Sequence, residues 1–465
     1  MIRYLIYVLI NLSPCFLFAQ ASDMIGTWEG ELKVRGQKIT VFFNIAPQQD
    51  GQLTATLDVP SQMQYDLQMD EVTVDSNEIT IDFKQGNLQY KGKLSPYLST
   101  LKGVWAQGGG AFTLPLYRRK TTPYARPQTP QAPFDYDIEE VQYLNKTANI
   151  KLAGTLTIPK GKDKYPVAIL ISGSGAQDRN SALLKHKPFW VIADYLTSQG
   201  IAVLRFDDRG VGQSKGDFAK ATTADFATDV TAALQYLQKH PRIDKYQIGL
   251  IGHSEGGAIA QIVAAQQKKK IDFVVLLAAQ GVSGKAILLQ QLEDILQQEG
   301  VDKELIQTRV RMNEQLFEAI IKDDKQALQA GDLLPIIEED LNKMSAADKK
   351  LLGLEPASLM QSFPSFVSPW MRYYLEYDPA TNLSKIKSPI LAINGDKDLQ
   401  VAGEINLKAI EQQVSKNTPL TIKLLLNHNH LLQHSESGAI DDYLKIEETI
   451  SPEVLELIAT WIHEL

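Results

Sequence analysis

Cysteine is nearly absent from this chain, whose 465 residues include only Cys15. A single cysteine excludes a disulfide scaffold and any zinc site built from several cysteines. Long basic runs are also missing, and 47 lysines and arginines against 55 aspartates and glutamates give a net charge of −8. Nucleic-acid-binding proteins carry large clusters of lysine and arginine, and this chain has no long basic run, so we expect no nucleic-acid partner.

Apolar runs are short beyond the first 21 residues, although the 44% hydrophobic content is ordinary for a globular protein. Residues 1–21 join Arg3 to an apolar stretch, which Pro14 interrupts, and end in a small-x-small pattern at Ala21. The stretch is shorter than the ~20 residues that span a bilayer, so it predicts a cleaved signal peptide rather than an anchor. We expect a periplasmic or extracellular protein without a stable membrane span. A lipoprotein acylated at Cys15 is the alternative, which Pro14 disfavours.

Residues 22–120 alternate between apolar and polar positions, which predicts a small all-β barrel or sandwich domain. The strand candidates are 38–43, 53–57, 78–83 and 87–90. Trp28 and Trp105 are interpreted as core residues, with a ligand-binding barrel as the alternative. Four prolines in 121–134 predict a stiff linker and a domain boundary.

Residues 135–465 alternate between apolar strands and helices, which predicts a mostly parallel sheet with helices on both faces. The expected strands are 167–171, 201–206, 247–251, 273–277, 389–393 and 420–426, after a hairpin over 138–158. Residues 284–375 interrupt this alternation with a helical pattern and no strand. We interpret them as a helical cap over the strand ends, or else as a peripheral helical subdomain.

The sequence GHSEG at 252–256 is a G-x-S-x-G motif between an apolar strand and a small-residue helix. A nucleophile on such a tight turn needs strained backbone angles, and Gly252 and Gly256 remove side chains that would clash. Ser254 is therefore the candidate nucleophile.

A serine nucleophile needs a base and an orienting acid, and on such a sheet they follow the serine in the order acid and then histidine, each on a loop after a later strand. Asp398 is favoured as the acid over Asp396, which is better placed to shape the turn. His430 is favoured as the base over His428, with His434 third. His428 and His430 are two residues apart, so both point the same way on an extended segment.

The loop at 172–179 reads SGSGAQDR and follows the first buried strand. Its glycines let the backbone approach a substrate, so the N–H groups of Ser174 and Glu255 are the candidate oxyanion hole. The side chain of Glu255 is expected to add negative charge near the acyl pocket. The glycine-bearing loop 207–214 is interpreted as support beneath the site, paired with Asp178 and Arg179.

These motifs together resemble the α/β-hydrolase superfamily over residues 138–465. The loop at 172–179 resembles that of bacterial carboxylesterases, several of which are secreted with a small all-β domain in front. The resemblance implies Ser254 as nucleophile, Asp398 as acid and His430 as base. Ala176 stands where many of these enzymes have proline.

The expected function is a secreted carboxylic-ester hydrolase acting on a small-molecule ester through an acyl-enzyme, with no metal or organic cofactor. A serine aminopeptidase is the first alternative, for which the acidic run 338–340 would supply the carboxylates that bind a free N-terminus. A non-catalytic glycan- or lipid-binding protein is the second. The sequence leaves the acyl chain, the alcohol and the oligomeric state open.

Overall fold

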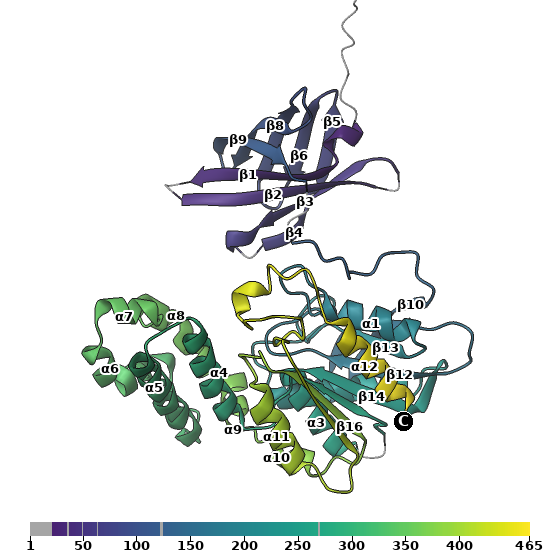
Figure 1. Cartoon of the computed structure of the whole chain (residues 1–465), viewed down its shortest axis with the longest axis vertical. Helices are drawn as coiled ribbons and strands as arrows, with labels where there is room; N and C mark the ends of the chain where they lie inside the picture. Colours follow the sequence, from purple (N-terminus) through teal and green to yellow (C-terminus); the bar gives the residue numbers. More distant parts are fainter. Residues whose placement is uncertain (1–20, 35–36, 49, 63, 121–123, 268–269) are drawn as a thin grey trace, which may run out of the picture. The chain divides into compact units, whose positions relative to one another are not determined.

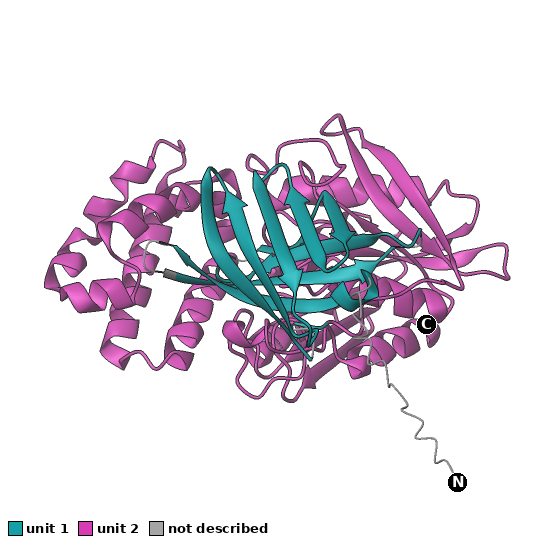
Figure 2. Ribbon diagram, turned by 90° about the horizontal axis from the view of Figure 1, so that it is seen from above, with its two compact units in different colours: residues 1–125 teal, residues 126–465 magenta. Residues whose placement is uncertain are grey.

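The computed structural model describes residues 21–34, 37–48, 50–62, 64–120, 124–267 and 270–465. The chain divides into two compact units, residues 1–125 and 126–465 (Figure 2). Most of the expected signal peptide, including Cys15, lies outside the described residues. Within the described part, none of the helices combines the length and apolarity needed to cross a membrane.

Unit 1 is one nine-stranded antiparallel sheet in the order β4-β3-β2-β1-β9-β8-β7-β6-β5. Its strands are β1 (Gly26–Val34), β2 (Gln37–Pro47), β3 (Leu53–Val59), β4 (Gln64–Gln68), β5 (Glu71–Asp75), β6 (Glu78–Phe83), β7 (Leu88–Leu94), β8 (Thr100–Gln107) and β9 (Gly110–Arg118). Strands distant in this order share one core, in which the rings of Phe43 and Tyr90 lie 5.6 Å apart. The sheet is therefore curled like a barrel. Trp28 and Trp105 are buried in that core, which confirms their interpretation as packing residues.

Unit 2 contains an eight-stranded sheet in the order β10-β11-β13-β12-β14-β15-β16-β17. Its strands are β10 (Asp137–Asn145), β11 (Ile150–Ile158), β12 (Tyr165–Ile171), β13 (Ala202–Phe206), β14 (Ile243–His253), β15 (Val274–Leu277), β16 (Ile390–Gly395) and β17 (Leu420–Leu425). The first three strands of this order pair antiparallel, and the sheet is parallel from β13 to β17. The carboxyl ends of β14, β16 and β17, where the candidate catalytic loops begin, thus meet at one edge.

Helices cover both faces of this sheet (Figure 1). One face packs against α1 (Pro188–Ser198) and α12 (Pro452–His463). The other packs against α2 (Thr223–Leu237), α3 (Glu255–Gln266) and α11 (Gly403–Gln413), with the short α10 (Ala380–Leu383) beside α3. Neighbours along β12 alternate between the two cores, so Ile169 faces one and Leu170 the other. This alternation explains why a two-sided parallel strand is apolar throughout.

Residues 284–376, all of which are described, form only helices and connecting turns, as the sequence predicts. The helices are α4 (Gly284–Gln298), α5 (Lys303–Lys322), α6 (Leu334–Lys343), α7 (Ala346–Leu351), α8 (Pro356–Phe366) and α9 (Pro369–Glu376), with a short 3-10 turn at Ala330–Asp332. They share a core of their own, and α4 to α8 gather beside the sheet in Figure 1. The segment is anchored to the sheet domain through α4 and α9, whose side chains reach the pocket described below.

Candidate active site

Ser254 lies on a strained turn between β14 and α3. Its backbone angles are φ 55° and ψ −123°, a conformation that non-glycine residues rarely adopt outside functional turns. A Cβ added at Gly252 would lie 2.2 Å from the carbonyl oxygen of Gly256, and one at Gly256 would lie 2.1 Å from that of Ile171. The two glycines are therefore required by the backbone itself, and the turn has the geometry of a nucleophile elbow.

His430 and Asp398 are brought together by the loops after β17 and β16. The Nδ1–H of His430 donates to Oδ2 of Asp398 at 2.8 Å, and both side chains are buried. The other carboxylate oxygen of Asp398 accepts from the backbone N–H groups of Gln400 and Val401, each at 2.8 Å. Because Nδ1 carries the proton, Nε2 of His430 is left with a lone pair that can accept a proton.

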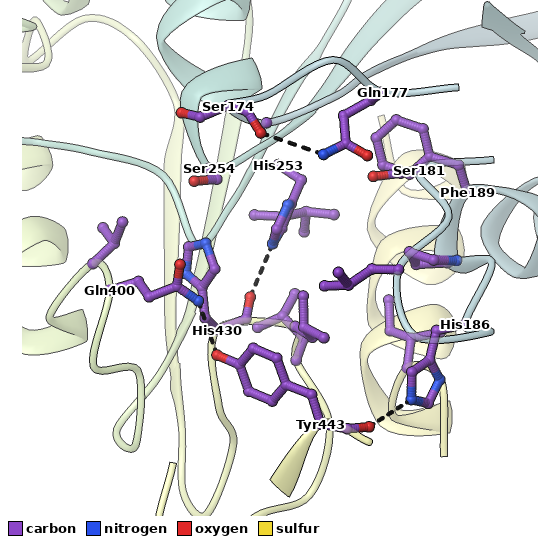
Figure 3. Close-up of a pocket in the computed structure, with 18 of the residues that line it drawn as sticks. Ser174, Gln177, Ser181, His186, Phe189, His253, Ser254, Gln400, His430 and Tyr443 are labelled. Atoms are coloured by element: carbon purple, nitrogen blue, oxygen red, sulfur yellow. Dashed lines mark hydrogen bonds between the residues drawn. The ribbon is translucent and has the colours of Figure 1, made fainter. Parts of the chain in front are cut away.

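Ser254 and His430 line the same pocket, and their side chains lie on one side of it in Figure 3. His253 Nε2 donates to the backbone carbonyl of His430 at 2.9 Å, so the residue before the nucleophile holds the loop that carries the candidate base. Burial lowers the pKa of His253 to about 4, which keeps this imidazole neutral at physiological pH. Sequence reasoning missed this positioning role, which depends on residues 177 positions apart.

The loop after β12 passes directly beside Ser254. A Cβ added at Gly173 would lie 3.1 Å from Cβ of Ser254, so a larger residue at this position would crowd Ser254. Ser174 follows it at the pocket wall, where its carbonyl accepts from the side-chain amide of Gln177 at 3.3 Å. Glu255 is the first residue of α3, so its N–H has no acceptor within the helix. Both candidate N–H donors thus lie in the two segments that flank Ser254.

The loop 207–214 lies under this segment, as expected. Arg179 forms hydrogen bonds with both oxygens of Asp207 at 3.0 and 2.7 Å, which confirms the expected pairing of Arg179. Asp178 instead accepts from nearby backbone N–H groups at Asn180 and Ala182. Asp208 accepts from the Ser172 hydroxyl and from the N–H of Gln177, and burial raises its pKa to about 7.

Glu255 does not line the pocket, so the negative charge expected of its side chain is not placed at the pocket wall. Its carboxyl group is buried and accepts hydrogen bonds at Oε1 from the Thr223 hydroxyl at 2.7 Å and the Trp370 indole at 2.8 Å. Burial raises the pKa of Glu255 despite these bonds, which disfavours its charged form. The side chain thus connects the nucleophile elbow to α9.

The remaining candidates lie outside the catalytic arrangement. Asp396 accepts from the N–H of Asn427 at 2.6 Å, so it joins the loops after β16 and β17. His428 and His434 form a cross-strand pair that does not line the pocket. In the acidic run on α6, Glu338 and Glu339 are exposed, and Asp340 pairs with Arg311 at 3.0 Å. That run is a solvated helix face and does not supply carboxylates to the pocket.

The pocket has a volume of about 350 Å³ and is lined by both the sheet domain and the helical segment 284–376. Its apolar wall is formed by Leu183, Pro188, Phe189, Ile192, Leu277, Ile287, Leu288, Trp370, Val401, Leu431, Leu432 and Ile450. Among the described lining residues there is no aspartate, glutamate, lysine or arginine. The cavity therefore suits an uncharged organic group next to Ser254.

Comparison with known proteins agrees with the fold and the elbow. Residues 188–330 match a family model described as "Serine aminopeptidase, S33". Esterase EstD of Thermotoga maritima is 26% identical over 333 residues, which cover 70% of this chain and 69% of that protein. The eight-stranded sheet covered by helices on both faces, with Ser254 on the turn after β14, has the architecture of the α/β-hydrolase fold.

Two of the solved structures that align with this chain do so over most of their own length. A hypothetical protein from Pseudomonas aeruginosa aligns with 18% identity and a TM-score of 0.44, covering 74% of this chain and 98% of that one. An esterase of Pyrococcus furiosus aligns with 18% identity and a TM-score of 0.41, covering 71% and 93%.

Proposed function

We propose that this protein is a serine carboxylic-ester hydrolase that acts through an acyl-enzyme. The observation that carries the proposal is a strained Ser254 lining one pocket with His430, whose Nδ1–H donates to Asp398. The name of its relative from Thermotoga maritima, an esterase, supports the reaction class.

The proposed reaction has two stages. Ser254 Oγ attacks the ester carbonyl while Nε2 of His430 takes the hydroxyl proton, and Asp398 stabilises the resulting imidazolium. The N–H groups of Ser174 and Glu255 stabilise the oxyanion, and His430 returns the proton to the departing alkoxide as the C–O bond breaks. Water then attacks the acyl-enzyme with the same base, releasing the acid and restoring Ser254.

Serine aminopeptidase activity is the second candidate, because the matching family model carries that description. A free N-terminal ammonium group needs a nearby carboxylate, and the described pocket lining offers none. An uncharged ester needs no carboxylate partner, so the pocket lining favours esterase activity.

Replacement of the nucleophile tests the mechanism. Ser254→Ala should abolish hydrolysis of p-nitrophenyl esters and labelling by a fluorophosphonate probe while circular dichroism stays unchanged. Loss of a triad serine commonly costs on the order of 10⁴-fold or more in turnover. Labelling that persists at another serine would refute the assignment, and faster turnover of aminoacyl-p-nitroanilides than of esters would favour the peptidase.

We further propose that the protein is exported. The support is the composition of residues 1–21, with Arg3, an apolar stretch and a small-x-small end. N-terminal sequencing of the protein recovered from a cell fraction outside the cytoplasm should begin at Ser22. Recovery in the cytoplasm with residues 1–21 intact would contradict export.

A further inference from the structure

The chain folds back on itself just after β17 and places two histidines face to face. Backbone hydrogen bonds join Ser435 to Asn427 at 2.8 Å and Asn429 to Gln433 at 3.0 Å. His428 and His434 therefore form the non-hydrogen-bonded pair between them, the type of pair in which side chains come closest. Their ring centroids are 4.4 Å apart.

One ring nitrogen of His428 forms a hydrogen bond, and the other has no partner among the described residues. Its Nδ1–H donates to the carbonyl of Leu426 at 2.8 Å, so Nε2 carries a lone pair. His428 is 1% exposed, and its Nε2 has no hydrogen-bond partner among the described residues. Buried nitrogen atoms are almost always paired, so this one indicates a ligand.

Two further candidate ligands lie close to His428. His434 directs Nδ1 to the carboxylate of Glu448 at 3.0 and 3.1 Å, which leaves its Nε2 available. Glu453 lies in the first turn of α12, whose start is held to the loop by a bond from the N–H of Ser451 to the carbonyl of Leu432 at 2.9 Å. One ligand atom from each of His428, His434 and Glu453 lies within 4.8 Å of the others.

We propose that His428, His434 and Glu453 form a binding site for a divalent transition-metal ion, with zinc as the best match. Two imidazoles and one carboxylate are a ligand set that zinc accepts, with a water molecule in the fourth position. Tetrahedral ligand atoms about 2.1 Å from the metal are about 3.4 Å apart. The exposed side chains of His434 and Glu453 can close to that distance while buried His428 stays in place.

The hydrogen bonds of the second ring nitrogens of the two histidines are also those expected for metal-binding histidines. A histidine ligand usually donates its second ring N–H to a carbonyl or a carboxylate, as His428 does to Leu426 and His434 does to Glu448. The serine mechanism expected from the sequence implied no metal, and Glu453 lies on a different element from the two histidines. The site lies outside the pocket lining, so it is distinct from the proposed ester-hydrolysis site.

The metal would brace the loop that carries His430. The carbonyl of His428 accepts from the N–H of Lys397 at 3.0 Å, and Lys397 precedes Asp398. An ion bound to His428 thus connects the loops of the acid and the base to the start of α12.

The experiment is a zinc titration of the untagged protein after treatment with EDTA, using competition with a chromophoric chelator. The unmodified protein should bind one zinc ion per chain, and zinc should raise its Tm. His434→Ala and Glu453→Gln should each lose both effects. Glu448→Gln should weaken binding by about 10-fold or more through the second ring nitrogen of His434.

His463→Ala is the matched control, because His463 is an exposed histidine at the other end of α12. It should bind zinc like the unmodified protein. The proposal is overturned if the unmodified protein binds no zinc at micromolar concentration, or if His434→Ala binds it with undiminished affinity. Neither result bears on ester hydrolysis, since Ser254 is unchanged throughout.

Discussion

At the scale of single residues, the two neighbouring carboxylates Asp396 and Asp398 differ in their hydrogen-bond partners. Asp398 accepts hydrogen bonds from the imidazole of His430 and from two backbone N–H groups, whereas Asp396 accepts one from the backbone N–H of Asn427. Both lie on the loop after β16, so sequence position alone distinguishes them poorly. Their hydrogen bonds support Asp398 as the proposed orienting acid.

Asp398→Asn should lower kcat by about 10⁴-fold, because a neutral amide neither favours the productive tautomer nor stabilises an imidazolium. Asp396→Asn should stay within about 10-fold of the unmodified protein, since the amide oxygen can still accept from Asn427. Steady-state hydrolysis of p-nitrophenyl acetate measures both. If Asp396→Asn is the inactive variant, the acid has been assigned to the wrong residue.

Asp208 should make the stability of the protein depend on pH. Burial raises its folded-state pKa to about 7, above the usual aspartate value of 3.8, so the folded state binds more protons than the unfolded state between these pH values. Its contribution to the free energy of unfolding therefore falls as the pH rises from about 4 through 7. Asp208→Asn should remove this contribution, and the Ser172 hydroxyl can turn to accept from the new amide.

Urea unfolding at pH 5 and pH 8 checks this prediction. The unmodified protein should lose more stability between the two pH values than Asp208→Asn does. Other titrating groups are common to both proteins and cancel in the difference. Parallel stability profiles would contradict an elevated pKa at Asp208.

At the scale of elements, α9 is attached to the elbow by one polar contact, the bond from Trp370 to Glu255. The indole also stacks on Tyr374, with ring centroids 4.9 Å apart. Trp370→Phe keeps an aromatic ring for that stacking but removes the donor, and a lost hydrogen bond to a buried group costs about 1–3 kcal/mol. The helical segment 284–376 should therefore become more sensitive to limited proteolysis.

Thr223→Val provides the matched comparison. Thr223 donates to the same oxygen of Glu255 but belongs to α2 of the sheet domain. Thr223→Val should lower the stability of the protein without making the helical segment 284–376 more sensitive to limited proteolysis. Equal proteolysis of the segment in both variants would mean that the Trp370 contact does not hold α9.

The elements themselves were largely predictable because their signals are local. Apolar runs marked the parallel strands, and GHSEG marked the turn at Ser254. In unit 1 the strand candidates did not include β1, β4, β5, β8 or β9. The strands β4 and β5 are short, and their alternating side chains are only half-buried and carry few strong apolar signals. A weak period over five residues does not distinguish an edge strand from a loop.

The contacts that complete the site join distant residues and could not be predicted in this way. The Trp370 indole that donates to Glu255 is 115 positions away, and burial raises the pKa of the Glu255 carboxyl group. The pairing of His428 with His434 depends on the register of a loop, which period-two reasoning does not fix. The chemistry of such residues can be assigned only when their three-dimensional contacts are known.

At the scale of the whole molecule, the two compact units have separate hydrophobic cores. All residues of the proposed triad and oxyanion hole belong to unit 2. Arg126 and Gln128, just after the boundary, donate to carbonyls of unit 2, including those of Leu444 and Ile450. Unit 2 thus begins with residues that are hydrogen-bonded to the rest of the same unit.

Deleting residues 22–120 should therefore leave a folded protein that hydrolyses a small soluble ester at a rate within about 3-fold of the full chain. The physical reason is that a unit with its own core folds independently of its neighbour. Purified truncated and full-length proteins can be compared by circular dichroism and by kcat/KM for p-nitrophenyl acetate. A truncated protein that is folded yet inactive would show that unit 1 contributes to catalysis. Deletion of residues 22–130 is the complementary variant, since it also removes Arg126 and Gln128, and it should unfold at a lower temperature than the shorter deletion.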